Sequence, residues 1–213
     1  MEQDILAQPM ADDELDSAKR RQILDGARLV FLAHGFDAAS MGEIARAAGV
    51  SKGTLYVYFA SKHDLFESLV RNQCRLTAER LFTLDADNHD VADALRRLGL
   101  SFLEAMLEPS HVSTVRMVIG AADRQPEIGR LFLASGPRAG WSRLAAWLRV
   151  KVEHGELAIE DVDIAAQQFL TMLNGSVMLP VLLGGEAPPP RERLVYVIDR
   201  AVAMFLAAYG VKP

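Results

Sequence analysis

Residues 40–62 read SMGEIARAAGVSKGTLYVYFASK, and this stretch predicts two short helices joined by a tight turn. Ser40 and Glu43 have the spacing of a capping box, in which each side chain bonds the backbone amide of the other residue at a helix start. Gly49 permits a tight turn that a side chain would obstruct. The two helices are expected over residues 41–48 and 51–59.

The apolar residues of this stretch form its expected core. Ala45 is small where two helices must cross closely, and Ile44, Val50 and Leu55 supply the contacts between them. Such packing presents the second helix outward as a rigid rod that fits the major groove of DNA, while the first helix crosses the backbone. The spacing therefore predicts a DNA-binding helix-turn-helix.

Polar side chains on and around the second helix are the candidates for contacts with DNA. Residues at its start can reach base edges or phosphates, and tyrosine hydroxyls and lysine ammonium groups suit phosphate oxygens. The alternatives are that Tyr56 and Tyr58 are core aromatics and that Lys52 and Lys62 are ordinary solvated charges. The candidate contacts are Arg20, Arg21, Ser40, Ser51, Lys52, Gly53, Thr54, Tyr56, Tyr58 and Lys62.

The distribution of charge along the chain locates the expected nucleic-acid surface. The 213 residues carry a formal charge of −5, which taken alone argues against a nucleic-acid partner. Residues 1–18 hold six acidic and no basic side chains, and we expect a disordered acidic tail there. Residues 19–63 hold seven basic and three acidic side chains, a local charge of +4 that coincides with the predicted helix-turn-helix.

The rest of the chain repeats apolar residues at spacings of three and four, which predicts an all-α fold of about nine helices. Gly35 is expected to end the first helix in a left-handed conformation. Pro137 is expected to break or kink the long stretch that contains it, because its ring clashes with the preceding turn. The remaining helices are expected over about residues 17–34, 61–76, 91–106, 115–122, 128–152, 162–183 and 191–209.

Several pieces of this sequence resemble the DNA-binding domain of the TetR/AcrR family: Gly35-Phe36 to Ser40-Met41, IARAAGVSKGTLYVYF at residues 44–59, Ser61-Lys62 and Leu65-Phe66. The similarity covers about residues 19–66. It implies a helix-turn-helix DNA-binding domain over that range and a larger helical ligand-binding and dimerisation domain over residues 67–213.

The resemblance also implies a function. Members of this family act as homodimeric transcriptional repressors that bind a palindromic DNA operator and are released from it by a small, largely apolar ligand. An effector-independent regulator or an activator of the same fold is the alternative. The expected partners are double-stranded DNA, a second copy of the chain and a small-molecule effector, in the cytoplasm and without a membrane.

The predicted regulatory half contains candidates for a ligand pocket and for a dimer interface. Ordinary core packing is the alternative for each pocket residue, and burial within the monomer is the alternative for the interface. The pocket candidates are Phe102, Met106, Arg116, Met117, Trp141, Phe169, Met172 and Asn174. The interface candidates are Ala166, Phe169, Leu173, Val177, Leu194, Val197, Ile198, Ala201 and Phe205.

Enzymatic and metal-binding functions find no support in the sequence. It contains no nucleophile elbow, no phosphate-binding glycine loop and no zinc-protease motif, so neither catalytic residues nor a cofactor are expected. The single cysteine, Cys74, excludes an internal disulfide. Asp87, His89, Asp90 and Asp93 are interpreted as the entry of a helix rather than as a metal site.

Overall fold

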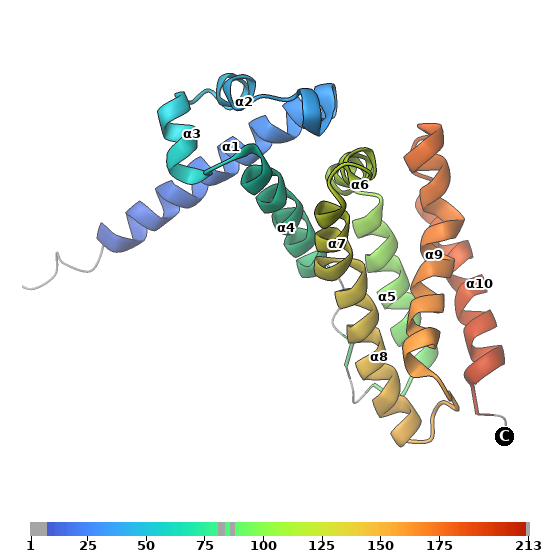
Figure 1. Cartoon of the computed structure of the whole chain (residues 1–213). Coiled ribbons are helices and arrows are strands. Elements are labelled where there is room, and N and C mark those ends of the chain that lie inside the picture. The colour runs from blue at the N-terminus through green and yellow to red at the C-terminus, as the bar shows by residue number, and fades with distance from the viewer. Residues whose placement is uncertain (1–7, 81–83, 86–87, 212–213) are drawn as a thin grey trace, which may run out of the picture. The chain divides into compact units, whose positions relative to one another are not determined.

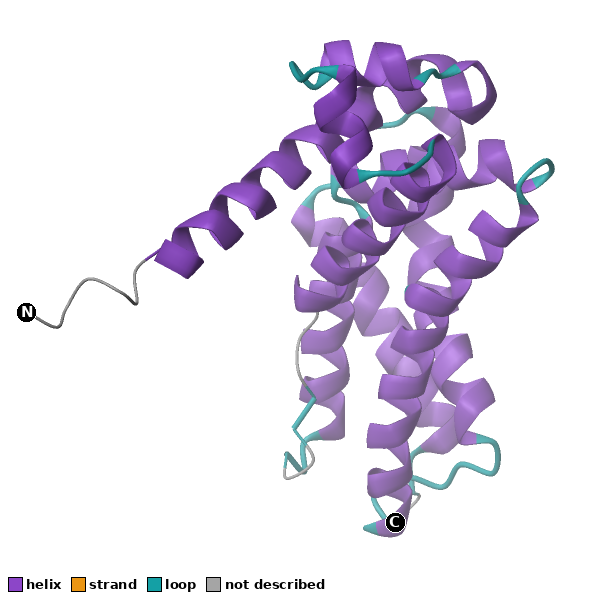
Figure 2. Ribbon diagram, turned by 60° about the vertical axis from the view of Figure 1, so that its left-hand side comes forward, coloured by secondary structure: helices purple, strands orange, loops and turns teal. Residues whose placement is uncertain are grey.

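The computed structural model of the chain describes the backbone of residues 8–80, 84–85 and 88–211, and its side chains from residue 18 onward. Within these ranges every regular element is a helix, and Leu157 and Gly210 form an isolated bridge (Figures 1 and 2). The all-α prediction is confirmed. The helices are α1 (Gln8–Ala38), α2 (Met41–Ala47), α3 (Lys52–Tyr58), α4 (Lys62–Arg80), α5 (Val91–Met106), α6 (Pro109–Ala122), α7 (Pro126–Ser135), α8 (Pro137–Glu153), α9 (Val162–Gly184) and α10 (Arg191–Tyr209).

The chain divides into two compact units. The first unit consists of residues 1–72 together with residues 117–131, and the second consists of residues 73–116 and 132–213. Residues 117–131 therefore join the first unit, although the sequence assigned them to the regulatory half. The chain crosses between the units within α4, α6 and α7.

The first helix begins earlier than predicted, and its regular geometry breaks where predicted. Helix α1 is recorded from Gln8, whereas the sequence placed its start near Ser17. Gly35 has φ 72 and ψ 174, so the helical path is interrupted at this glycine. The predicted acidic tail falls partly on residues 1–7, which lie outside the described residues.

Prolines set the starts of three helices. Pro109, Pro126 and Pro137 are the first residues of α6, α7 and α8, a position where the missing amide of proline costs no helical hydrogen bond. Pro137 separates the stretch predicted over residues 128–152 into α7 and α8. This break accounts for ten helices in the described chain against a predicted total of about nine.

The core of the second unit is built around α9. This helix packs against α5, α8 and α10, and α10 also packs against α5 (Figure 1). It is also the one helix in the described chain long and apolar enough to cross a membrane, a test that the core helix of a soluble protein passes equally well. Its buried residues belong to the apolar core, so the helix gives no support for a membrane span.

The predicted dimer interface is wrong, because all of the residues assigned to it lie in this core. Each is no more than 8% exposed in the isolated chain. Helices α9 and α10 are apolar over more than one face because they pack on several neighbours within one chain, and not because a partner covers these residues. The residues reassigned from the interface to the core are Ala166, Phe169, Leu173, Val177, Leu194, Val197, Ile198, Ala201 and Phe205.

Candidate nucleic-acid interface

The start of α2 is held by the predicted capping box. The Ser40 hydroxyl accepts a hydrogen bond from the Glu43 amide at 3.2 Å, and the Glu43 carboxylate accepts one from the Ser40 amide at 3.0 Å. Hydrogen bonds from Ser40 lower the pKa of Glu43, so this carboxylate stays charged at the positive end of the helix dipole. Ser40 therefore fixes the start of α2 as well as being exposed.

The turn and the start of α3 are also held locally. Gly49 has φ 63, and the amide of Val50 donates to the carbonyl of Ala45 at 2.9 Å. The Ser51 hydroxyl accepts from the Thr54 amide at 2.9 Å and lies 2.8 Å from the Thr54 hydroxyl. These bonds cap α3 and fix the orientation of its exposed face.

A close crossing of α1 over the end of α2 fixes the helix-turn-helix on its support. A Cβ at Gly26 would lie 2.6 Å from the backbone nitrogen and Cα of Ala48. Gln22 donates from Nε2 to the carbonyl of Ala48 at 2.6 Å. Sequence reasoning missed both residues, although a glycine in the middle of a predicted helix is a signal of close packing.

The outward face of α3 carries several polar residues and one strongly exposed apolar side chain. Leu55 is buried, whereas Ser51, Lys52 and Gly53 are exposed. The exposed fraction of Tyr56 is 53% and that of Val57 is 83%. Val57 was missed by the sequence analysis, although an exposed valine suits contact with a thymine methyl group in the major groove.

Tyr56 and Tyr58 differ in environment. The exposure of Tyr56 excludes the alternative of a core aromatic for that residue. Tyr58 is half-buried and has an interaction partner within the chain, which is nearer to that alternative.

Lys52 lies back across the first turn of α2. A Cβ at Gly42 would be 2.9 Å from Cε and 3.2 Å from Nζ of Lys52. The absence of a side chain at Gly42 therefore leaves the space that the Lys52 side chain occupies. The two residues are ten positions apart, and only the folded turn brings them together.

The structure gives Lys62 a different role from the phosphate contact that was predicted. Its ammonium group donates to the carbonyls of Asp37 at 3.0 Å and Ala39 at 2.9 Å, and it lies 4.6 Å from the centre of the Phe36 ring. These carbonyls follow the break of α1 at Gly35, where the backbone needs donors from elsewhere. Lys62 thus ties the start of α4 to the link between α1 and α2.

The two predicted arginines also differ from one another. Arg20 lies 4.5 Å above the Phe59 ring and donates to the Ser68 hydroxyl at 3.2 Å, so it packs within the first unit. Arg21 is exposed and lines, with Arg46, a surface depression of about 720 Å³. Arg21 and Arg46 lie beside the end of α2 and face solvent.

Residues 117–131 are attached to the segments that flank the helix-turn-helix by one ion pair and one hydrogen bond within the first unit. Arg124 pairs with Asp37, and this carboxylate raises the pKa of the guanidinium. His63 Nε2 lies 3.2 Å from a carboxylate oxygen of Glu127. Movement of residues 117–131 would therefore act directly on the segments that support α2 and α3.

The predicted ligand-pocket residues are only partly brought together. Phe102, Trp141 and Met172 are partly buried against the same core that contains Phe169. Arg116 donates to the carbonyls of Val181 at 2.7 Å and Leu182 at 3.0 Å, so it closes the end of α9 and is not a free handle for a ligand. Of the other candidates, Met106 is half-buried, Met117 belongs to the first unit, and Asn174 has a buried Oδ1 without a hydrogen-bond partner.

A buried polar group in the second unit was not predicted. His111 Nδ1 lies 3.3 Å from the Thr77 hydroxyl, and Gln73 Nε2 donates to that hydroxyl at 3.4 Å. Burial lowers the pKa of His111 to about 4, so its imidazole is neutral near pH 7. Hydrophobic periodicity places these residues on inward faces but does not show that they meet.

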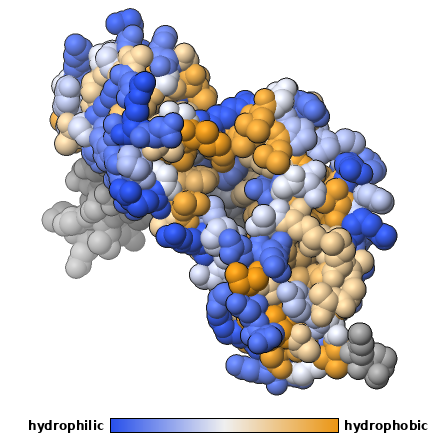
Figure 3. Space-filling model, turned by 45° about the vertical axis from the view of Figure 1, so that its right-hand side comes forward, coloured by the Kyte–Doolittle hydropathy of each residue, from blue (hydrophilic) through white to orange (hydrophobic). Residues whose placement is uncertain are grey.

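An exposed apolar stripe runs along α9 and α10. The side of the second unit formed by these helices carries hydrophobic surface (Figure 3), and between them lies an open groove of about 680 Å³. The exposed fraction is 76% for Leu183 and 63% for Met204. The large apolar members of the stripe are Ile164, Leu179, Leu183, Tyr196 and Met204.

Comparison with known proteins identifies both parts of the chain. Residues 23–69 match the family described as bacterial regulatory proteins, tetR family. Residues 93–211 match the family described as AefR-like transcriptional repressor, C-terminal domain.

Individual relatives agree with these matches. The HTH-type transcriptional repressor BepR of Brucella suis is 32% identical over 166 residues, 73% of this chain and 77% of BepR. The chain spans 34 to 51% of the length of three further curated repressors that it matches. These relatives are transcriptional regulators and not enzymes.

Solved structures resemble the chain over nearly its whole length. The flavonoid-responsive regulator FrrA is 34% identical, with a TM-score of 0.80 over 92% of this chain and all of that one. A transcriptional regulator of the TetR family from Mesorhizobium loti is 27% identical, with a TM-score of 0.82 over 92% of this chain and 98% of that one.

Proposed function

This chain belongs to the TetR family of bacterial regulatory proteins, and we propose that it is a cytoplasmic transcriptional repressor that binds a palindromic DNA operator as a homodimer. The observation that carries the proposal is the outward face of α3, where Ser51, Lys52, Gly53, Tyr56 and Val57 are exposed on a helix capped at its start and fixed by the turn at Gly49. A rigid, exposed helix of this kind enters the major groove of DNA.

Electrostatics support the same face. The basic block at residues 19–63 lies in the first unit, and its exposed cations Arg21, Arg46 and Lys52 remain available for phosphates. Lys62 and Arg20 instead hold the unit together. We therefore assign the phosphate contacts to Arg21, Arg46 and Lys52. The acidic remainder of the chain is expected to make no contact with the DNA.

The proposed dimer forms through the exposed stripe of α9 and α10. A patch with several large apolar side chains is costly in water, and a second copy of the same stripe would cover it by two-fold symmetry. The open groove beside Met172 and Met204 offers a concave surface for side chains of the partner. The helix-turn-helix domains of the two copies would then bind half-sites about one DNA turn, roughly 34 Å, apart.

The proposed effector is a small aromatic compound, since FrrA, which resembles 92% of this chain, is a flavonoid-responsive regulator. Phe102, Trp141 and Met172 offer apolar contacts around the core of the second unit. The unpartnered Oδ1 of Asn174 would accept a hydrogen bond from a phenolic hydroxyl.

Ligand binding would act by population shift. The effector would favour a conformer in which the separation of the two helix-turn-helix domains no longer matches the spacing of the operator half-sites. Helices α4, α6 and α7 each contribute residues to both units, so a change in the second unit would reach the first along these helices. The ion pair of Arg124 with Asp37 and the hydrogen bond between His63 and Glu127 would pass movement of residues 117–131 to the helix-turn-helix.

Selection of genomic DNA fragments by the purified full chain tests the function. We expect recovery of a palindromic sequence near the gene for this protein or its neighbours. A panel of flavonoids should then release the protein from that DNA, and replacement of Asn174 by Leu should weaken the release without weakening DNA binding. Failure to enrich any sequence at low salt would overturn the proposal, whereas enrichment without release by any compound would favour an effector-independent regulator.

A further inference from the structure

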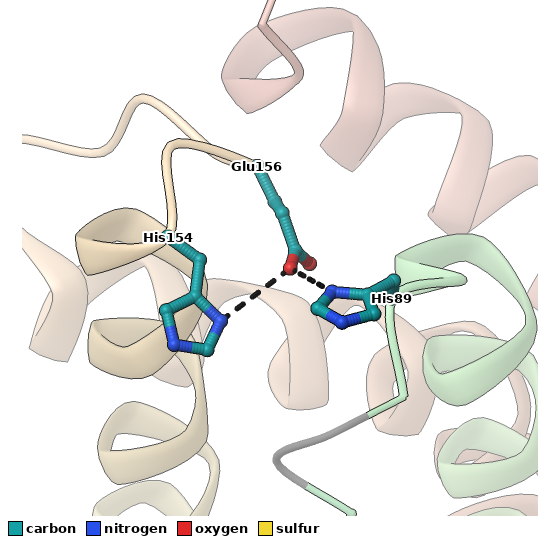
Figure 4. A group of neighbouring side chains, drawn as sticks. All are labelled: His89, His154 and Glu156. Atoms are coloured by element: carbon teal, nitrogen blue, oxygen red, sulfur yellow. Dashed lines mark hydrogen bonds and ion pairs between the residues drawn. The ribbon is translucent and has the colours of Figure 1, made fainter.

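Three side chains from two separate segments converge at one end of the second unit. His89 comes directly before Asp90, the residue that caps the start of α5, and His154 caps the end of α8. Glu156 follows Gly155, whose φ of 71 turns the chain back after α8. The two imidazoles and the carboxylate point toward one another (Figure 4).

The distances within this cluster approach those of a metal site. Nδ1 of His89 lies 2.6 Å and Nδ1 of His154 lies 3.5 Å from the same carboxylate oxygen of Glu156. The three ligand atoms are all within 4.8 Å of one another. Tetrahedral zinc with bonds of about 2.0 to 2.1 Å needs its ligand atoms about 3.3 Å apart. Side-chain rotations that change these separations by up to about 1.5 Å would therefore complete the geometry.

A buried lysine holds the carboxylate in place. Lys151 is completely buried, and its Nζ lies 3.3 Å from Oε2 of Glu156 and 5.4 Å from the centre of the Trp147 ring. This ion pair engages Oε2 and leaves Oε1 facing both histidines. Partners that engage the distant atom of a ligand in this way orient metal sites and tune their affinity.

The neighbouring aspartates have other roles. The Asp90 carboxylate accepts from the Asp93 amide at 2.9 Å, as the predicted helix entry requires. Asp87 lies outside the described residues. The side chain of His89 therefore contacts Glu156, 67 positions away, rather than the neighbouring aspartates.

We propose that His89, His154 and Glu156 bind a divalent transition-metal ion, for which Zn²⁺ is the best match. Two imidazole nitrogens and one carboxylate oxygen are ligands that zinc accepts, and three protein ligands leave a fourth position open to water or a small anion. The ion would clip the segment before α5 to the turn after α8. The site is independent of the proposed repressor activity.

Equilibrium titration of the untagged full chain, stripped of metal by a chelator, tests this site with Zn²⁺ alone. We expect one ion bound per chain, measured by calorimetry and by competition with a chromogenic chelator. Bound zinc should also raise the unfolding temperature, because only the folded chain gathers the three ligands. His154→Ala and Glu156→Gln should each weaken binding by about tenfold or more, since loss of an outer partner alone costs about that much.

A matched variant and a spectroscopic probe separate this site from binding elsewhere. His34→Ala removes an exposed histidine of the first unit and should leave zinc binding unchanged. Co²⁺ should give the visible absorption of a tetrahedral complex, and His89→Ala should abolish it. Circular dichroism will verify that each variant is folded. Wild-type chain that binds no zinc, or a His89→Ala/His154→Ala variant that binds it as tightly as wild type, would overturn the proposal.

Discussion

Gly42 and Lys52 show how a residue without a side chain can control one with a functional group. Because a methyl group at position 42 would lie 2.9 Å from Lys52 Cε, Gly42→Ala should displace the lysine while the fold adapts. We expect weaker or altered DNA binding together with unchanged or slightly higher stability, by up to about 1 kcal/mol from helix propensity.

Fluorescence anisotropy with the selected operator checks this coupling. Gly42→Ala should add nothing to the effect of Lys52→Ala when the two are combined, because both act through the same side chain. Gly120→Ala, where the new methyl group would meet nothing within 4 Å beyond the neighbouring backbone of its own helix, is the control and should bind DNA normally. Fully additive losses in the double variant would contradict the coupling.

His111 predicts a pH dependence of stability. Its pKa is lowered by burial from 6.5 to about 4, so the unfolded chain binds a proton between these values while the native chain does not. The free energy of unfolding should therefore rise with pH through this window, and the stability gained should be lost as the pH falls from about 6.5 to about 4.

Urea unfolding across this pH range measures the effect. His111→Gln should flatten the dependence, because the replacement does not titrate there. The control His34→Gln alters an exposed histidine and should leave the dependence unchanged. An unaltered pH profile in His111→Gln would show that other groups carry the effect.

The residue scale also shows where sequence reasoning stops. The capping pair Ser40 and Glu43 was predicted from spacing alone, because capping is decided by neighbours along the chain. Lys62 was not, because its partners are carbonyls 23 and 25 residues away, exposed by the break at Gly35. Side chains with long reach are assigned by the fold, and spacing does not identify their partners.

At the scale of elements, the crossing of α1 and α2 depends on Gly26. The atoms that a Cβ would meet belong to the backbone of Ala48 and cannot rotate away. Gly26→Ala should therefore destabilise the protein by about 1 to 3 kcal/mol through overpacking, although alanine favours a helix. Urea unfolding should show Gly120→Ala to be as stable as wild type or more so. Equal stability of the two variants would refute the close crossing.

Element positions were largely predictable and their buried faces were not. Periodicity, glycines and prolines located the helices, and the differences concern boundaries such as Gln8 and Pro109. The interface prediction failed because apolar residues on α9 and α10 mark both the core and the surface stripe. Only the packing of α9 against α5, α8 and α10 tells these faces apart.

At the scale of the whole molecule, the exposed stripe predicts the oligomeric state. Leu179→Glu combined with Met204→Glu would place charges where a partner must exclude water, so the variant should be a folded monomer. Size-exclusion chromatography with light scattering measures this. Val57→Glu, an equally drastic change on an exposed valine of the first unit, should remain dimeric. A dimer that survives in the double variant would place the interface elsewhere.

Core and interface residues on the same helices should behave differently. Phe205 is buried in the second unit, and Phe205→Ala should lower stability by about 3 to 5 kcal/mol. The Leu179→Glu/Met204→Glu variant should unfold at nearly the same urea concentration as the wild type when the wild type is diluted to a monomer. The net charge of −5 is likewise a whole-molecule quantity that conceals a local surface, the +4 block of the first unit.

The salt dependence of operator binding by wild type, Lys52→Ala and Lys62→Ala tests most directly the claim that the exposed side of the helix-turn-helix reads DNA. Lys52→Ala should weaken binding, and the magnitude of the slope of log K against log salt should fall by about 0.9 per chain, because one phosphate contact is lost. Lys62→Ala should leave the slope unchanged and lower only the stability of the protein. A slope reduced by Lys62→Ala, with binding unaffected by Lys52→Ala, would contradict the account.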